Sequence, residues 1–117
     1  MYITAIETDA QGRLWVGTQG AGVYVLDGEE WSHHKIDESH TAGAFVNGIA
    51  VDSQGRAWVA TSEGASVFDG KEWTTYTPEN SGLATPHINA VAVDGKDRAW
   101  FATVEGVHVF DGSTWKR

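Results

Sequence analysis

The sequence predicts an all-β fold built from three similar units, and three observations support this fold class. One motif recurs with a period of about 42 residues and places tryptophan at the same point of each copy: Trp15, Trp58 and Trp100. No segment keeps the 3.6-residue apolar period of a helix over three turns, and glycines interrupt the chain too often for long helices. Each copy divides into short strand-like segments separated by turn residues. A fixed period of this length is typical of architectures made of stacked units.

The second copy illustrates the expected strands. Its β-branched and aromatic segments predict four strands over 46–51, 56–61, 65–68 and 72–76. Between them lie the turn sequences Asp52-Ser53-Gln54-Gly55, Ser62-Glu63-Gly64 and Asp69-Gly70. Four short strands joined by tight turns form an antiparallel meander.

The polarity of these strands predicts how the units are arranged. The first and second strands are apolar on both faces, as in a sheet packed between neighbouring sheets, whereas the fourth is more polar and suits an outer rim. This pattern is typical of a β-propeller blade with its first strand at the axis. We therefore expect a single three-blade segment over residues 1–117, with blades at about 2–43, 44–85 and 86–117. Residues 32–44 and 77–86 are expected to form the loops between blades.

The composition argues against several kinds of partner. Eight Lys and Arg residues face sixteen Asp and Glu residues, for a net charge of −8, so nucleic acid and anionic membranes are not expected partners. There is no cysteine for a disulfide or thiolate metal site, no histidine spacing typical of a zinc site, and no apolar run of membrane-spanning length. We expect no cofactor and no bound metal.

The repeated motif resembles the two-component-regulator propeller repeat and is more distantly similar to the streptogramin lyase propellers. The resemblance rests on Asp-x-x-Gly, Trp-Val/Phe-Gly/Ala-Thr, Val-Tyr/Phe and Asp-Gly-x-x-Trp, and it covers nearly all of residues 3–115. It implies a propeller of six to eight blades, often the periplasmic sensing part of a bacterial regulator. Two departures stand out. Asp97 replaces the turn glycine found at Gly12 and Gly55, which predicts a looser turn, and only three blades are present.

Three blades do not close a ring. The apolar outer faces of the first and last blade would be exposed unless further blades cover them. The chain is either a piece of a longer propeller, natural or engineered, or a unit that identical copies complete by head-to-tail contacts. The segment begins at the first strand of a blade and stops two residues after Trp115, which favours completion by copies. The expected assembly is a six-bladed homodimer, with a nine-bladed homotrimer as the alternative.

Most repeated polar and aromatic residues have a structural explanation. The Asp9/Asp52/Asp94 and Asp27/Asp69/Asp111 series are expected to cap turns and not to bind a cation. Thr18, Thr61 and Thr103 are expected to form local hydrogen bonds at strand ends. Trp15, Trp58 and Trp100 are expected to pack between blades. Trp31, Trp73 and Trp115 lie on the outer strand, where partial exposure would allow a sugar to stack on them.

The expected ligand site lies at the channel mouth. His87 precedes the first strand of the third blade, Glu63 and Glu105 lie in loops that open on the same face, and His40 lies in the first connecting loop. A small molecule or carbohydrate is the expected ligand. No nucleophile motif or metal set accompanies these residues, so the chain is predicted to be non-catalytic. The alternative is a streptogramin-lyase-like enzyme in which a histidine and a glutamate at this mouth perform acid–base chemistry.

Overall fold

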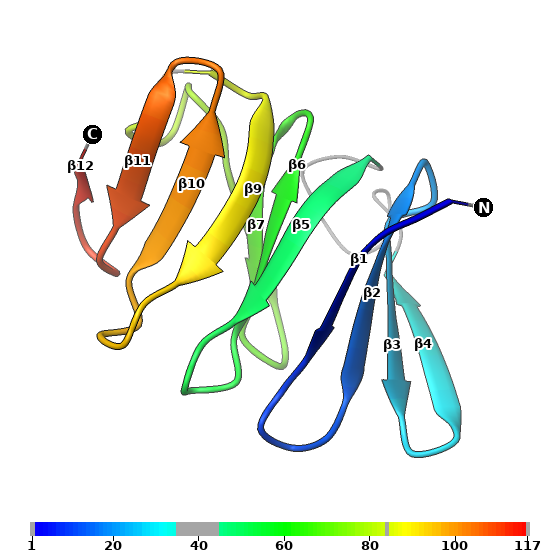
Figure 1. The fold of residues 1–117 in the computed structure, drawn as a ribbon. Coiled ribbons are helices and arrows are strands. Elements are labelled where there is room, and N and C mark those ends of the chain that lie inside the picture. Colours follow the sequence, from blue (N-terminus) through cyan, green and yellow to red (C-terminus); the bar gives the residue numbers. More distant parts are fainter. Residues whose placement is uncertain (1, 35–44, 84, 117) are drawn as a thin grey trace.

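Three four-stranded antiparallel sheets follow one another along the chain in a computed structural model that describes residues 2–34, 45–83 and 85–116 (Figure 1). The first sheet has the order β1-β2-β3-β4, formed by Tyr2–Thr8, Leu14–Gln19, Val23–Asp27 and Glu30–His34. The second has the order β5-β6-β7-β8, formed by Val46–Val51, Ala57–Thr61, Gly64–Phe68 and Trp73–Tyr76. The third has the order β9-β10-β11-β12, formed by Ile88–Val93, Ala99–Thr103, Gly106–Phe110 and Trp115–Lys116.

The all-β fold and the four-stranded meander in each unit are therefore confirmed. The first strands β1, β5 and β9 lie next to one another, and the rim strands β4 and β12 lie at opposite sides of the molecule (Figure 1). One detail of the prediction was wrong. His33 and His34 were expected in the loop between blades, but they belong to β4, because the pairing with β3 continues to Val23 opposite His34.

The turn between the first two strands of each blade has the same geometry in all three copies. Gly12 and Gly55 adopt positive φ angles of 83° and 80°, and their amides donate to the carbonyl oxygens of Asp9 and Asp52 at 3.1 and 3.0 Å. Asp97 adopts a φ of 59°, and its amide donates to the carbonyl oxygen of Asp94 at 3.0 Å. The expectation of a looser turn was wrong, because aspartate tolerates the left-handed region better than most side chains.

Two apolar cores lie between the blades. Trp15, Val23 and Val25 of the first blade pack against the second blade, and Trp58, Ala65 and Val67 of the second pack against the third. Trp15 contacts Phe68 with ring centroids 6.1 Å apart, and Trp58 contacts Phe101 and Phe110 at 6.1 and 6.0 Å. Each blade therefore has a forward face, which meets the next blade in the chain, and a backward face, which meets the preceding one.

The third copy of the core tryptophan behaves differently from the other two. Trp15 and Trp58 are 1 % and 2 % exposed, as expected, whereas Trp100 is 37 % exposed. The prediction that Trp100 is buried between blades was wrong for the single chain, because Trp100 lies on the forward face of the third blade and no following blade covers that face. On the outer strand, Trp31 is exposed, whereas Trp73 and Trp115 are only partly exposed and lie against Phe68 and Phe110.

The first interblade contact leaves no room for a side chain at Gly17. A Cβ atom there would lie 2.5 Å from Cγ1 and 3.1 Å from Cβ of Val46, whose branched side chain has little freedom to move away. We expect Gly17→Ala to lower the free energy of unfolding by about 1 to 3 kcal/mol through overpacking. Chemical denaturation measures this loss. The control is Gly95→Ala, because a Cβ at that turn position would meet nothing within 4 Å; equal losses in the two variants would contradict the close approach.

Candidate functional site

The residues predicted to bind a ligand lie at one end of the sheets. Glu63 is in the turn between β6 and β7, Glu105 is in the turn between β10 and β11, and His87 directly precedes β9. By strand direction these three points share the same end, at the top of Figure 1. All three residues are exposed. His40 lies outside the described residues.

The backbone of this end is held by threonine side chains and not by the predicted ligand groups. The Thr61 and Thr103 hydroxyls accept the amides of Glu63 and Glu105 at 3.1 and 3.0 Å. The Thr61 and Thr103 hydroxyls also donate to the carbonyl oxygens of Gly64 and Gly106, which start the next strands, and the Thr18 hydroxyl donates to that of Gly22, just before β3, all at 2.8 to 2.9 Å. The local role expected for these threonines is confirmed. Across the described parts of the chain, no hydrogen bond or ion pair joins the side chains of Glu63, His87 and Glu105, so they are separate exposed groups on one end.

The opposite end carries a cluster of aspartate, arginine and tryptophan that recurs in every blade. In the first blade, Asp9 Oδ1 accepts the amides of Gln11 and Arg13 at 2.9 and 2.8 Å. Its Oδ2 accepts Nε of Arg13 at 2.7 Å and the indole N–H of Trp15 at 3.0 Å. The Arg13 guanidinium also lies over the Trp15 ring, 5.7 Å from its centroid. One carboxylate thus closes the turn and fixes the tryptophan that packs on the next blade.

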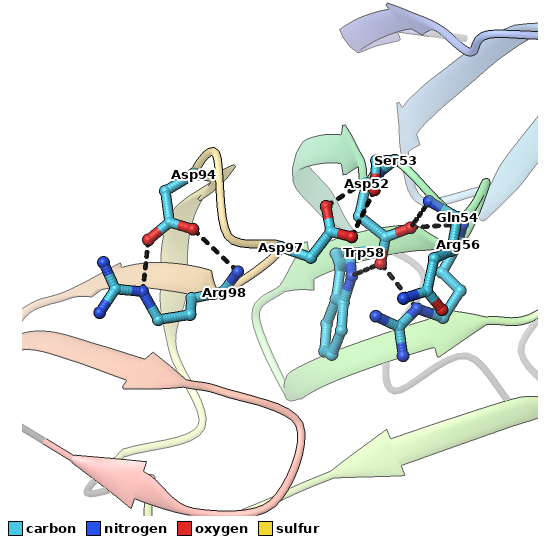
Figure 2. Close-up of polar contacts among 8 residues, drawn as sticks. All are labelled: Asp52, Ser53, Gln54, Arg56, Trp58, Asp94, Asp97 and Arg98. Atoms are coloured by element: carbon cyan, nitrogen blue, oxygen red, sulfur yellow. Dashed lines mark hydrogen bonds and ion pairs between the residues drawn. The ribbon is translucent and has the colours of Figure 1, made fainter.

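The other two clusters repeat this arrangement. Asp52 accepts hydrogen bonds from Gln54, Arg56 and Trp58, and Asp94 accepts hydrogen bonds from the amide and Nε of Arg98. Figure 2 shows both sets of bonds. Trp100 donates to Asp94 at 2.8 Å. Each carboxylate already accepts four hydrogen bonds, which explains why the series has a structural role. Among the described residues, no group of three His, Cys, Asp or Glu side chains could hold a metal ion.

Hydrogen bonds lower the pKa of Asp9 and of Asp94. Burial works against the charged form of Asp9, but the bonds from Trp15 and Arg13 outweigh it and lower the pKa below its usual value. The indole of Trp100 lowers the pKa of Asp94 far below the usual range. The turn residues Asp69 and Asp111 accept two backbone amides each, which lower their pKa as well. They cap turns, as expected.

Asp97 adds a contact between blades that sequence reasoning missed. Its carboxylate accepts both the amide and the hydroxyl of Ser53, which lies in the corresponding turn of the second blade (Figure 2). These bonds lower the pKa of Asp97. The signal in the sequence was the departure from glycine itself, because a side chain at this position can reach the neighbouring blade where glycine cannot.

A second feature absent from the sequence prediction is a hollow at the rim between the first two blades. It has a volume of about 170 Å³ and is lined by Arg13, Trp15, Val25, Asp27, Ser32, His34 and Phe68. His34 Nδ1 accepts the indole N–H of Trp73 at 3.4 Å, and burial, with the neighbouring His33, lowers the pKa of His34. Sequence alignment of the copies places His34 where Tyr76 stands in the second blade.

These features define three consecutive blades of a β-propeller. The family model for the two component regulator propeller matches residues 1–20 and 42–63. The resemblance of the motifs to this repeat is thus confirmed, over parts of the first and second copies. No curated protein matches the chain. None of the described segments forms a helix with the length and apolar character needed to cross a membrane.

Solved propellers share the fold. The extracellular domain of the hybrid two component system BT3049 from B. thetaiotaomicron is 26 % identical with a TM-score of 0.82, over 97 % of this chain and 16 % of that one. PorZ, a surface component of the type-IX secretion system of Porphyromonas gingivalis, is 20 % identical with a TM-score of 0.74, over 93 % of this chain and 17 % of that one. A luciferin-regenerating enzyme is 17 % identical with a TM-score of 0.66, over 93 % of this chain and 42 % of that one. The chain therefore spans less than half of each of these proteins.

Proposed function

We propose that the chain is a non-catalytic β-propeller module that pairs with a second copy to close a six-bladed ring and binds a ligand at the channel mouth. The similarity to the extracellular domain of a two component system supports the first part of this proposal, that the chain is a propeller repeat module. The observation that supports ring closure is the pair of apolar faces at the two ends of the arc. Ile6 on the first blade is 63 % exposed and Val107 on the third is 53 % exposed. Apolar surface of this extent favours a partner.

A small molecule or carbohydrate is the proposed ligand. Glu63, His87 and Glu105 lie on one end of the sheets and are all exposed, so they are available to a ligand. In a ring of two copies each of them would occur twice around the axis. An acidic mouth with histidines suits a neutral or cationic ligand that offers hydroxyl or amine donors, because these groups pair with carboxylates.

The separation of these groups supports binding over catalysis. General acid–base chemistry needs an acid and a base held within hydrogen-bond reach of the reacting atoms. The carboxylates with several donors lie at the opposite end, where they hold turns. The likeness to the luciferin-regenerating enzyme concerns the fold alone and favours no reaction here.

The solution mass tests ring closure. Light scattering on a sizing column, over a range of concentrations, is expected to give a sharp peak at twice the 12.7 kDa of the single chain. A monomer at all concentrations would overturn self-closure, and the open faces would then belong to further blades of a longer chain. A sharp trimer would overturn the six-bladed ring in favour of nine blades.

Calorimetric titration with sugars and small amines, repeated on Glu105→Gln, tests the ligand site.

A further inference from the structure

The two internal junctions use the same positions, and this repetition identifies the partner of each open face. On the forward side, Trp15 and Trp58 occupy equivalent positions, and Trp100 is the third member of the series. On the backward side, Val46 and Ile88 begin β5 and β9 and are fully buried against the preceding blade. Their equivalent in β1 is Ile3, which is exposed. The third blade therefore offers a forward face without a partner, and the first blade offers a backward face without a partner.

Both open faces are hollowed and apolar. On the first blade a hollow of about 280 Å³ is lined by Ile3, Val16, Tyr24 and Trp31. On the third blade a hollow of about 230 Å³ is lined by three alanines and four larger apolar residues: Ala90, Val91, Ala92, Trp100, Phe101, Ala102 and Val107. Small residues on a forward face are what the internal junctions also use. Gly17 makes room for Val46, and Gly48 lies against the backbone of β9.

A polar contact marks the register of each internal junction. The Thr4 hydroxyl donates to the carbonyl oxygen of Val46 at the first junction. At the second junction, Nδ2 of Asn47 donates to the carbonyl oxygen of Ile88 at 2.8 Å. Asn89 holds the equivalent position in the third blade and is exposed. In β1 the residue equivalent to Val46 and Ile88, whose carbonyl oxygens are the acceptors at the internal junctions, is Ile3.

We infer that the forward face of the third blade receives the backward face of the first blade of a second copy, in the register of the internal junctions. Asn89 donates to the carbonyl oxygen of Ile3 of that copy. Trp100 lies over Val16 and Leu26 of that copy, the positions equivalent to Phe101 and Phe110 beneath Trp58. This inference rests on the proposed ring and adds its junction, which is head-to-tail and occurs twice in a closed pair.

Complementary variants test this junction. Ile6→Glu places a charge on the backward face of the first blade, and Val107→Glu places one on the forward face of the third. Both positions are exposed in the single chain, so folding is retained, and circular dichroism checks it. Burying an unpaired carboxylate in an apolar junction is strongly unfavourable, so each variant alone is expected to dimerise at least about a hundredfold more weakly. An equal mixture of the two retains one unaltered junction and is expected to form a mixed pair, which native mass spectrometry detects.

The outcomes separate the junction from the ring. Suppose that the unaltered chain forms dimers. If either variant alone then dimerises as tightly as the unaltered chain, or if the mixture of the two stays monomeric, the head-to-tail junction is wrong while self-assembly stands. If the unaltered chain is monomeric, the proposed ring is wrong and the junction with it. Asn89→Ala supplies an independent readout: loss of one hydrogen bond is expected to weaken association about three- to tenfold at each junction while the unfolding midpoint of the dissociated chain is unchanged. No change in association would overturn the assigned register.

Discussion

Trp58→Ala is expected to lower the free energy of unfolding by about 3 to 5 kcal/mol, the loss typical of removing a large buried aromatic side chain. Trp58 is fully buried, and its ring contacts Phe101 and Phe110 of the third blade. Its indole also donates to Asp52 at 3.1 Å, so the substitution removes one of the donors that the buried carboxylate uses. Denaturant titration followed by tryptophan fluorescence or circular dichroism measures the loss.

The matched control is Trp100→Ala, at the same position of the third blade. In the dissociated chain this variant is expected to lose clearly less stability, because Trp100 is partly exposed there and has no blade in front of it. If two copies pair as proposed, the same variant is expected to show a larger loss at concentrations high enough for pairing. A loss of less than about 1 kcal/mol for Trp58→Ala would contradict the packing between the second and third blades.

Asp9→Ala is expected to lower the free energy of unfolding by about 2 to 4 kcal/mol, because it leaves the partly buried donors of Arg13 and Trp15 without their acceptor. The Asp9 carboxylate accepts two backbone amides, the Arg13 guanidinium and the Trp15 indole. Asp69→Ala is the control, since Asp69 is exposed and accepts only the amides of Lys71 and Glu72. Equal losses in the two variants would mean that the bonds to Arg13 and Trp15 contribute nothing.

The same network predicts a dependence on pH. Its hydrogen bonds lower the pKa of Asp9 in the folded state. A carboxyl whose pKa is depressed on folding contributes stability above its unfolded value of about 3.9 and loses that stability as the pH falls through the folded value. The stability difference between the unaltered chain and Asp9→Asn is therefore expected to be full at pH 7 and to shrink below about pH 4. A difference that stays constant from pH 7 to pH 2 would contradict this assignment.

Local chemistry predicted the blade itself. The four strands of the second copy were expected within one residue of their observed bounds, because Asp-x-x-Gly and Asp-Gly turns and alternating apolar residues act over a few neighbouring positions. The capping roles of Asp9, Asp52 and Asp94 were predicted for the same reason. Their bonds to arginine and tryptophan were not, since a side chain that closes a turn can meet the next strand only once the sheet has formed.

The sequence by itself determined the repeat, its strands, its turns and the apolar character of both blade faces. Only the tertiary structure decided which of these faces are covered. Trp15, Trp58 and Trp100 lie in nearly identical local sequences, yet the first two are buried and the third is partly exposed, because burial depends on the presence of a following blade. The same holds for the bonds between blades, such as those of Asp97 with Ser53 and of Asn47 with Ile88. They join residues more than 40 positions apart, a distance over which local sequence preferences carry no information and only the packing of one blade on the next brings the groups together.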